Sequence, residues 1–400
     1  AGLFVFAAVV AVAFLLGYRT RLVGAISLLL LVSLHVRYPM VLNGGDRLLR
    51  VLLLVALLTP LGERWSVDAL RRGDIRRRVA SVGTVALLCQ PVVVFTTNAV
   101  EKHRGEHWYA GDGLELALSD PTMTTELGAQ LLAYPPLLTA LNYAWVALLA
   151  GAAGFLLLTV GRLRTLAALA YLGAFVGIGL SLSVGLFPFA LAASVLPFVA
   201  TPFWDRLPGS DLRACLGSHL VRFVPSTGRP RSPLDASRAR PIATALSVVV
   251  LAWMLGFAGV DVAGVDPPEP LDSEHLDQQD WGLYAPDPAE SYSWHVVVAE
   301  REDGSTVGLD GGSGSSFDRP PDASAAYETF RHRRFASAVD GSARVDGPLA
   351  DRYAEWGCER AMPTGGDIES VAVYRLHRSK RIDGDDTNPQ RVTILDRACR

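Results

Sequence analysis

Lys102 is the residue whose type and position point most directly to chemistry. The chain has 37 lysines and arginines in total, and only Lys102 and Lys380 are lysines. Arginine is therefore its usual cation. A guanidinium stays charged at every accessible pH, whereas a buried amine can lose its proton and serve as a base. Lys102 follows the apolar run 79–100, where a membrane helix would meet water, while Lys380 is expected to be exposed.

Further titratable residues accompany Lys102 in the segment 101–113. Of these, His103, Glu106 and His107 are candidates to assist a base at Lys102. The simpler interpretation is an interfacial cluster, in which the lysine snorkels and Trp108 lies at the headgroup level. Two histidines four residues apart can hold a metal, but no carboxylate-rich or His-Glu-x-x-His pattern accompanies them. The sequence therefore predicts no metal site.

Polar residues in the run before Lys102 predict a cavity beside it. Asn98 closes a polar stretch, 96–98, in the last turns of an otherwise apolar segment. Polar side chains at such a depth are typical of a helix that lines a cavity. Pro91, inside the same run, predicts a kink in the helix.

Two loops before this run carry recognisable turn chemistry. The segment 43–46 reads Asn-Gly-Gly-Asp, so Asp46 is predicted as the N-cap of the next helix and the glycines as its turn. The segment 65–68 reads Trp-Ser-Val-Asp and is predicted to anchor and cap at the opposite membrane face. His35 ends the second apolar run and is expected to be solvated.

Long apolar runs dominate the first 260 residues and indicate a membrane protein. Half of the residues are hydrophobic, and a membrane-spanning helix needs about 20 apolar residues. The seventh run contains Pro188, Pro197 and Pro202, which should bend or break it. The chain begins inside the first run, so we expect its natural N-terminus to be missing. The runs are 1–18, 22–36, 47–61, 79–100, 136–160, 165–186, 187–204 and 241–260.

The two halves of the chain differ in charge. Residues 1–261 carry 22 basic and 14 acidic residues, a net charge of +8, and residues 262–400 carry 15 and 26, a net charge of −11. The basic residues gather in alternate loops, chiefly 63–78 and 205–240, and the positive-inside rule places these loops in the cytoplasm. The loop 102–135 and the acidic tail then lie outside. The basic residues thus belong to membrane loops, which indicates no nucleic-acid partner, and the lysine-poor, acidic composition is halophile-like.

The predicted fold is an all-α polytopic transmembrane helical bundle, residues 1–260, in the cell membrane. A small β-rich (α+β) extracytoplasmic domain, residues 261–400, follows it. Helices within 114–134 are predicted to lie along the outer face and cover the bundle. In the tail, Asp303-Gly304 predicts a hairpin between 294–299 and 305–309. The sequence also predicts a flexible loop at 311–316, a helix at 349–360 and a strand at 370–377.

The four cysteines divide between the two predicted regions. Cys358 and Cys399 both lie in the outer domain, where a disulfide could form. Cys89 lies in the middle of a predicted span, where a cysteine usually packs as a small hydrophobe. Cys215 belongs to a predicted cytoplasmic loop.

Together these motifs resemble the HTTM family of membrane proteins, to which the vitamin K-dependent gamma-glutamyl carboxylases are similar. The resemblance rests on residues 34–113, with the Asn-Gly-Gly-Asp turn, Trp65–Asp68, an Arg-rich loop and a helix that ends in Lys102 before Trp108. The order of the spans, Phe187-Pro188-Phe189 and the segment 281–288, Trp-Gly-Leu-Tyr-Ala-Pro-Asp-Pro, also resemble prokaryotic members. The resemblance implies one more helix before Ala1.

The resemblance implies a specific reaction. In the animal carboxylases the equivalent lysine deprotonates reduced vitamin K, which then reacts with oxygen to give a stronger base. That base removes a γ-proton from a substrate glutamate, and CO2 adds. Lys102 would then be a neutral base that acts on a reduced naphthoquinone of the menaquinol type, and the substrate a glutamate-containing peptide or protein. Asn98, Trp108 and Asp46 are the candidate residues for binding the quinol.

Two departures from the animal enzymes leave other functions open. The spacing from Lys102 to Trp108 is one residue longer, and no histidine stands at Gly45-Asp46. An aspartate there would favour a charged lysine. The alternatives are a non-enzymatic membrane protein that binds a lipid or a quinone, and a membrane anchor that presents the acidic outer domain to a partner.

Overall fold

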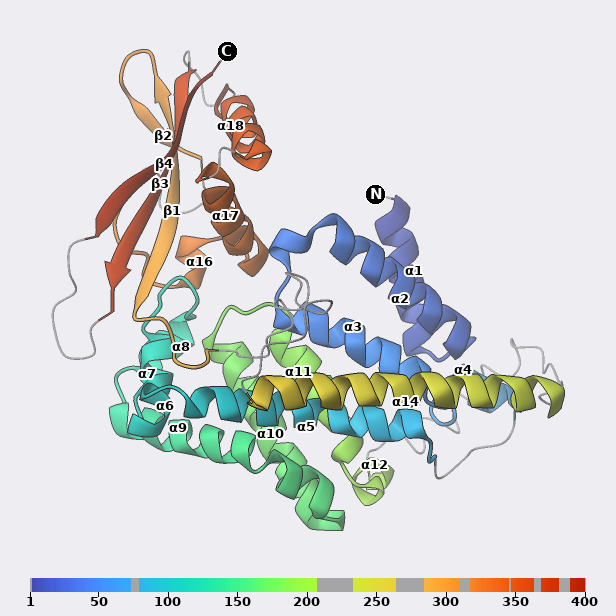
Figure 1. Ribbon diagram of the computed structural model, residues 1–400. Coiled ribbons are helices and arrows are strands. Elements are labelled where there is room, and N and C mark those ends of the chain that lie inside the picture. Colours follow the sequence, from blue (N-terminus) through green and yellow to red (C-terminus); the bar gives the residue numbers. More distant parts are fainter. Residues whose placement is uncertain are drawn as a thin grey trace.

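The computed structural model describes residues 2–72, 79–206, 233–263, 284–309, 317–344, 347–362, 368–380 and 389–399. It is mostly helical, with a small antiparallel sheet towards the C-terminus. Figure 1 shows a bundle of helices from the first part of the chain and, at one side of it, the sheet with its own helices. This matches the predicted order of a helical region followed by a β-rich domain.

The first helices form a hairpin that packs on the third. Helix α1 (Gly2–Leu15) contacts α2 (Thr20–Arg37), and α2 contacts α3 (Gly44–Leu57). A short helix, α4 (Val67–Arg72), lies close to the turn of the hairpin. The carboxylate of Asp68 accepts hydrogen bonds from the main-chain N–H groups of Arg19 and Thr20, at 2.9 and 2.7 Å. The predicted capping role of Trp65–Asp68 is therefore confirmed, although the helix that Asp68 caps is α2.

The Asn-Gly-Gly-Asp turn begins α3 in a different way from the prediction. Asn43, not Asp46, is the N-cap, and Asp46 occupies the third helical position in a reciprocal capping box. The glycines lie in the first turn because another helix passes close to them. A Cβ at Gly45 would stand 2.4 Å from the Cα of Phe187, so the sequence pattern reports a close helix contact as well as a cap.

Helix α5 (Val82–His103) runs through the centre of the bundle (Figure 1). Ser81 caps it by accepting from the N–H of Thr84. Pro91 lies inside it, and the helix continues to Lys102 and His103. Helix α5 packs against α9 (Pro135–Ala150), α11 (Phe187–Val195), α14 (Pro233–Ala263) and α3.

Four helices in the described part of the chain are long and apolar enough to cross a membrane: α2, α5, α10 (Gly161–Ser181) and the segment Pro241–Val260 of α14. Three shorter apolar helices accompany them, namely α1, α9 and the segment Phe187–Phe198. The predicted run 136–160 divides into α9 and the π-helix η2 (Ala153–Leu158). The run 187–204 is broken as predicted, into α11, a 3-10 turn η3 (Leu196–Phe198) and α12 (Thr201–Arg206).

Short helices cover one end of the bundle. They are η1 (Pro39–Val41), α6 (His107–Ala110), α7 (Gly113–Leu118) and α8 (Glu126–Leu131). Thr124 pairs with Leu182, which ties this cover to the end of α10. The helices predicted within 114–134 are present as α7 and α8, while their position along the outer face of a membrane stays a prediction.

The C-terminal domain is a four-stranded antiparallel sheet in the order β2-β1-β3-β4. The strands are β1 (Ser291–Arg301), β2 (Thr306–Gly308), β3 (Ile368–Ser379) and β4 (Gln390–Ala398). The predicted hairpin and the strand at 370–377 are confirmed, while β4 was not predicted. Helices α17 (Phe330–Ala343) and α18 (Pro348–Ala361) cover one face of the sheet (Figure 1). A short helix, α16 (Ala323–Ala326), precedes them.

A disulfide joins Cys358 on α18 to Cys399 after β4, so the bond considered from the sequence is present. Cys89 is a free, half-buried cysteine on α5. The described residues do not include the loop 311–316, Cys215, or the parts of the two Arg-rich loops at 73–78 and 207–232.

Direct contacts hold the sheet domain against the covered end of the bundle. The Ala323 N–H donates to the carbonyl of Thr124 at 2.9 Å, and Arg331 Nη2 lies 2.9 Å from Asp46 Oδ1. Lys380 Nζ donates to the Leu116 carbonyl at 3.0 Å. The expectation of an exposed Lys380 is therefore wrong, because the side chain bridges β3 to α7. Its burial lowers the pKa of the ammonium, and Asp120 partly offsets this.

Candidate functional site

Lys102 lies in the last turn of α5 and is almost completely enclosed, with 2% of its surface exposed. The side chain extends over the indole of Trp108, and Nζ is 3.4 Å from the ring centroid. The same Nζ donates to the main-chain carbonyl of Tyr284 at 2.9 Å. An amine buried at the end of an apolar helix, with defined partners, is an unusual arrangement for a residue that usually snorkels into water.

The carbonyl of Tyr284 joins the two key side chains. It also accepts from the indole Nε1 of Trp108 at 2.8 Å, so one oxygen receives both donors. Tyr284 has a positive φ of 51°, a left-handed conformation that a residue with a side chain adopts only at some cost. These hydrogen bonds help to hold that conformation, and they place a segment of the C-terminal region directly against Lys102.

Asn142, on α9, fixes the other side of Trp108. Its Nδ2 donates to the Trp108 carbonyl at 2.8 Å, and its Oδ1 accepts from the N–H of Leu114 at 3.0 Å. The side chain is fully buried. Sequence reasoning missed this residue, although a lone asparagine inside the apolar run 136–160 was a usable signal, because buried amides in membrane helices need partners.

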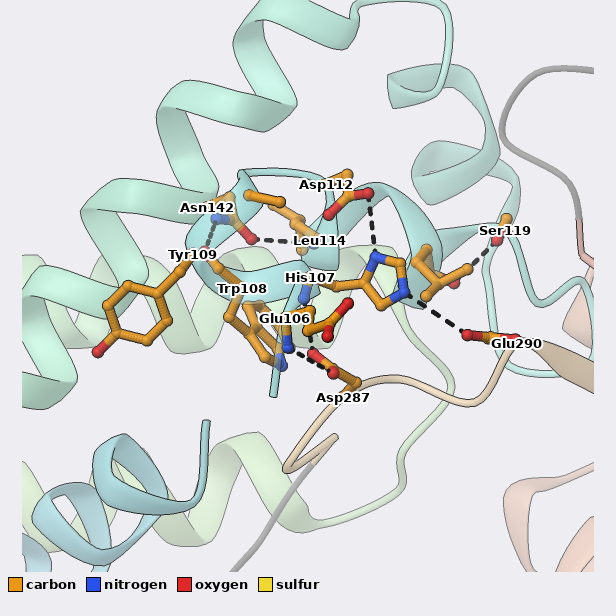
Figure 2. Close-up of polar contacts among 12 residues, drawn as sticks. Glu106, His107, Trp108, Tyr109, Asp112, Leu114, Ser119, Asn142, Asp287 and Glu290 are labelled. Atoms are coloured by element: carbon orange, nitrogen blue, oxygen red, sulfur yellow. Dashed lines mark hydrogen bonds and ion pairs between the residues drawn. The ribbon is translucent and has the colours of Figure 1, made fainter. Parts of the chain in front are cut away.

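Asp287 anchors the C-terminal segment to the turn after α5. Figure 2 shows its carboxylate against the backbone at Glu106 and His107, whose N–H groups lie 2.8 and 3.0 Å from the two oxygens. Gly105 makes this approach possible, because a Cβ there would stand 2.5 Å from Asp287 Oδ2 and from the Pro286 carbonyl. The contact explains why a glycine separates the Lys102 turn from α6.

His107 belongs to this anchor and not to the surroundings of the amine. Its Nδ1 lies 3.0 Å from Asp112 Oδ2, and its Nε2 lies 3.8 Å from Glu290 Oε1 (Figure 2). The hydrogen bond with Asp112 raises the pKa of the imidazole above its usual value, partial burial opposes this, and the charges of Asp112 and Asp287 add to the increase.

The other predicted assistants do not gather around Lys102. His103 is exposed and packs edge-on against Tyr109, with ring centroids 5.0 Å apart. Glu106 is exposed and contributes its main-chain N–H to Asp287. Asn98 is buried one helical turn before Lys102 and therefore faces the same side of α5. The cavity predicted beside Asn98 stays a prediction.

Asp46 forms a second buried polar group, at the start of α3. Its carboxylate accepts from the Asn43 N–H at 3.0 Å and from Arg331 at 2.9 Å. His35 Nε2 lies 4.0 Å from the same carboxylate, and His35 is 3% exposed. The expectation of a solvated His35 is therefore wrong. The fold thus places His35 beside the turn 43–46, which contains no histidine.

An enclosed amine with defined hydrogen-bond partners can take part in acid–base or ligand-binding chemistry. In the described part of the chain, no three His, Cys, Asp or Glu side chains form a group that could hold a metal ion. No family model, curated protein or solved structure matches the chain. The resemblance to the carboxylase-like membrane proteins therefore stays a prediction.

Proposed function

We propose that the chain is a carboxylase-like membrane enzyme in which the Lys102 amine acts as a base on a reduced naphthoquinone. The observation that carries this proposal is the enclosed position of Lys102, between the Trp108 ring and the Tyr284 carbonyl. A base at the edge of a membrane must be shielded from water and held in one place. Burial, the ring and the carbonyl supply both conditions.

The polar groups at the site suit the head of a quinol. The Lys102 amine and the Trp108 indole N–H both point at one acceptor oxygen, that of Tyr284. A quinol hydroxyl oxygen has the same acceptor character, and a neutral amine beside it can receive the hydroxyl proton. To bind there, the quinol would take over the hydrogen bonds that the Tyr284 carbonyl now accepts.

The proposed reaction needs O2 and CO2 as further substrates. One glutamate residue, one quinol, one O2 and one CO2 give one γ-carboxyglutamate, one quinone epoxide and one water. A bound quinol would, on oxidation by O2, supply the strong base for removal of the γ-proton, and CO2 would become the new carboxyl group. Lys102 accepts the first proton, while Asn142 and Asp287 keep Trp108 and the neighbouring turn in place.

The proposal includes a topology with the sheet domain outside the cell. The domain contacts the bundle through Asp46 at the start of α3, through Lys102 at the end of α5 and through Leu116. These points lie at the ends of the elements that the positive-inside rule places outside. A disulfide between Cys358 and Cys399 also suits an oxidising compartment.

A second function is favoured by the contact between Lys102 and Trp108. An Nζ centred 3.4 Å over an indole is the geometry of a cation–π interaction, which would suit a permanent ammonium with a structural role. The protein would then bind a quinone or another membrane lipid without chemistry. A membrane anchor for the acidic domain is the third candidate.

Incorporation of labelled CO2 tests the proposal. The full chain in lipid nanodiscs is given menaquinol, O2, labelled CO2 and a glutamate-containing peptide. We expect labelled peptide from the unchanged protein and a loss of at least about 100-fold in Lys102→Arg, which keeps the charge but not the base. Lys380→Arg is the matched control and keeps full activity.

Each other outcome selects an alternative. Equal activity in Lys102→Arg excludes Lys102 as the base. No labelled peptide, together with menaquinone binding that survives Lys102→Arg, supports the non-enzymatic quinone-binding protein. No binding of either quinone form, with a cellular function that is lost when the chain ends after residue 260, supports the anchor.

Labelling of cysteines tests the topology separately. Arg72→Cys, within the first Arg-rich loop, is expected to resist an impermeant thiol reagent in intact cells. A cysteine at Asp303, on the exposed hairpin of the sheet domain, is expected to react. The reverse pattern would overturn the orientation without touching the proposal for Lys102.

A further inference from the structure

The C-terminal domain contains a pocket of about 550 Å³ between α17 and α18. None of its lining residues belongs to the Lys102 site, and its volume is in the range of small-molecule sites. One wall is aromatic, with Phe335, Tyr353 and Trp356, and two arginines, Arg352 and Arg360, stand along it. An aromatic wall with two arginines along it, in a domain that is acidic overall, indicates a binding site for a specific kind of ligand.

The spacing of residues on α18 creates the wall. Arg352, Trp356 and Arg360 recur every four residues, so they lie along one face of the helix. Tyr353 stacks on Trp356, with ring centroids 5.1 Å apart and planes at 18°. Phe335 on α17 meets Tyr353 edge-on at 5.7 Å. Tyr353 is buried behind, whereas Trp356 is 41% exposed and presents its surface to the pocket.

The two arginines of the wall differ from several other arginines of this domain, which form ion pairs. Arg344 and Arg375 pair with Asp340, and Arg397 pairs with Asp351. Among the described residues, no carboxylate lies within ion-pair distance of Arg352 or Arg360; Arg360 lies 6.0 Å over the Trp356 ring. Both guanidinium groups are exposed and keep their hydrogen-bond donors for another partner.

We propose that this pocket binds a small organic carboxylate with a flat aromatic or apolar body. The body lies against Trp356, and the carboxylate takes the fork of hydrogen bonds from Arg352 or Arg360. A phosphate or another compact anion would leave the aromatic wall unused. Glu328, which also lines the pocket, disfavours a second acid group, so one carboxylate is expected. This inference does not depend on the reaction proposed for Lys102.

Binding of 2-naphthoate tests the inference. The full chain in phosphatidylcholine nanodiscs is titrated with 2-naphthoate by equilibrium dialysis, and empty nanodiscs measure uptake by lipid. 2-Naphthalenemethanol, with the same rings and no charge, and acetate, with the charge and no rings, are the matched probes. We expect 2-naphthoate to bind at least about tenfold more tightly than either, because a hydrogen bond to a charged group and ring burial both contribute.

Variants locate the site. Arg352→Gln together with Arg360→Gln is expected to weaken 2-naphthoate binding by at least about tenfold, and Trp356→Leu should weaken both naphthalene probes. Arg391→Gln is the control, because Arg391 also lies over aromatic rings, Phe317 and Tyr374, in the separate apolar cluster of the sheet. The thermal unfolding midpoint of each variant shows whether the exposed substitutions leave the fold intact.

Three results would overturn the inference. The first is equal binding of the neutral naphthalene probe, which would mark an apolar surface without anion recognition. The second is 2-naphthoate binding that the two arginine substitutions leave unchanged while the fold is intact. The third is no binding of 2-naphthoate alongside binding of an acidic peptide, which would make the face a protein-docking site.

Discussion

Lys102 donates a hydrogen bond to the main-chain carbonyl of Tyr284, 182 positions later in the chain. This contact joins the end of a central bundle helix to the segment that leads into the sheet domain. The candidate base is therefore completed by a part of the chain outside the helical region. Changes in the C-terminal segment should alter Lys102, and changes around Lys102 should loosen the domain.

Gly105→Ala is the sharpest test of this junction. The added methyl would stand 2.5 Å from Asp287 Oδ2 and from the Pro286 carbonyl oxygen, and the carbonyl cannot withdraw unless the main chain moves. We expect a loss of about 1–3 kcal/mol in the free energy of unfolding, as for other overpacked sites. Protease sensitivity of the segment near residue 287 should rise as the contact loosens.

Gly177→Ala is the control for this substitution. Gly177 lies in α10, and a Cβ there would meet nothing within 4 Å. The free energy of unfolding of Gly177→Ala should therefore stay the same or rise slightly, because alanine favours helices. Equal stability of Gly105→Ala and Gly177→Ala would mean that Asp287 does not dock on the turn after α5.

The ion pair between Arg331 and Asp46 should contribute to holding the sheet domain on the bundle. Asp46 is almost fully enclosed, while Arg331 is about half exposed, at 47%. Arg331→Gln leaves a buried carboxylate without its guanidinium, and we expect a loss of about 1 kcal/mol, near the low end for an orphaned buried group. Asp46→Asn with Arg331→Gln should recover part of this loss in a double-mutant cycle.

A surface ion pair provides the comparison. Arg397 and Asp351 are each about half exposed, at 52% and 54%, so Arg397→Gln should change stability by less than about 0.5 kcal/mol. Chemical unfolding of the four variants measures all of these differences. A coupling energy near zero between positions 46 and 331 would show that the pair does not tie the domain to the bundle.

The sequence was most informative where local chemistry decided the structure. The hairpin at Asp303-Gly304, the helix at 349–360 and the broken run 187–204 followed from turn residues, periodicity and prolines, and all are present. Lys102 stood out because its residue type was rare in the chain. The sequence could not show which groups complete the site, because Tyr284, which accepts from Lys102, and Asn142, which donates to the Trp108 carbonyl, come from other parts of the fold.

Two of the wrong predictions, those for His35 and Lys380, share a physical cause. His35 and Lys380 were expected in water because each lies at the end of an element, where histidine and lysine are usually solvated. Both ends are covered by the other domain, through Asp46 with Arg331 and through Leu116. Local sequence reports the end of an element, but only the docking of two domains determines whether that end is covered.

The pH dependence of stability should report on His107. Asp112 raises the pKa of His107 in the folded protein, so the folded state binds this proton more tightly than the unfolded state does. The contribution is fully present below the unfolded pKa of about 6.5 and is lost as pH rises through the folded value. The thermal midpoint, measured from pH 5.5 to 8.5, should therefore fall more with increasing pH than in His107→Gln.

Asp112→Asn separates this effect from other titrations. It removes the group that raises the pKa but keeps the imidazole, so its pH profile should approach that of His107→Gln. If the unchanged protein and both variants show parallel profiles, the hydrogen bond at 3.0 Å does not couple His107 protonation to folding.

Reduction of the disulfide should destabilise the sheet domain and leave the bundle intact. The bond between Cys358 and Cys399 closes a loop with a sequence separation of 41 that includes β3 and β4. Opening such a loop costs about 4 kcal/mol in the chain-entropy description. Cys358→Ala with Cys399→Ala should lower the unfolding midpoint of the domain by this mechanism, and a reducing agent should do the same to the unchanged protein but not to the variant. Hydrogen exchange, which resolves β3 and β4 from α5, measures the difference. Equal protection of β4 with and without the bond would show that the strand is held by its pairing with β3 alone.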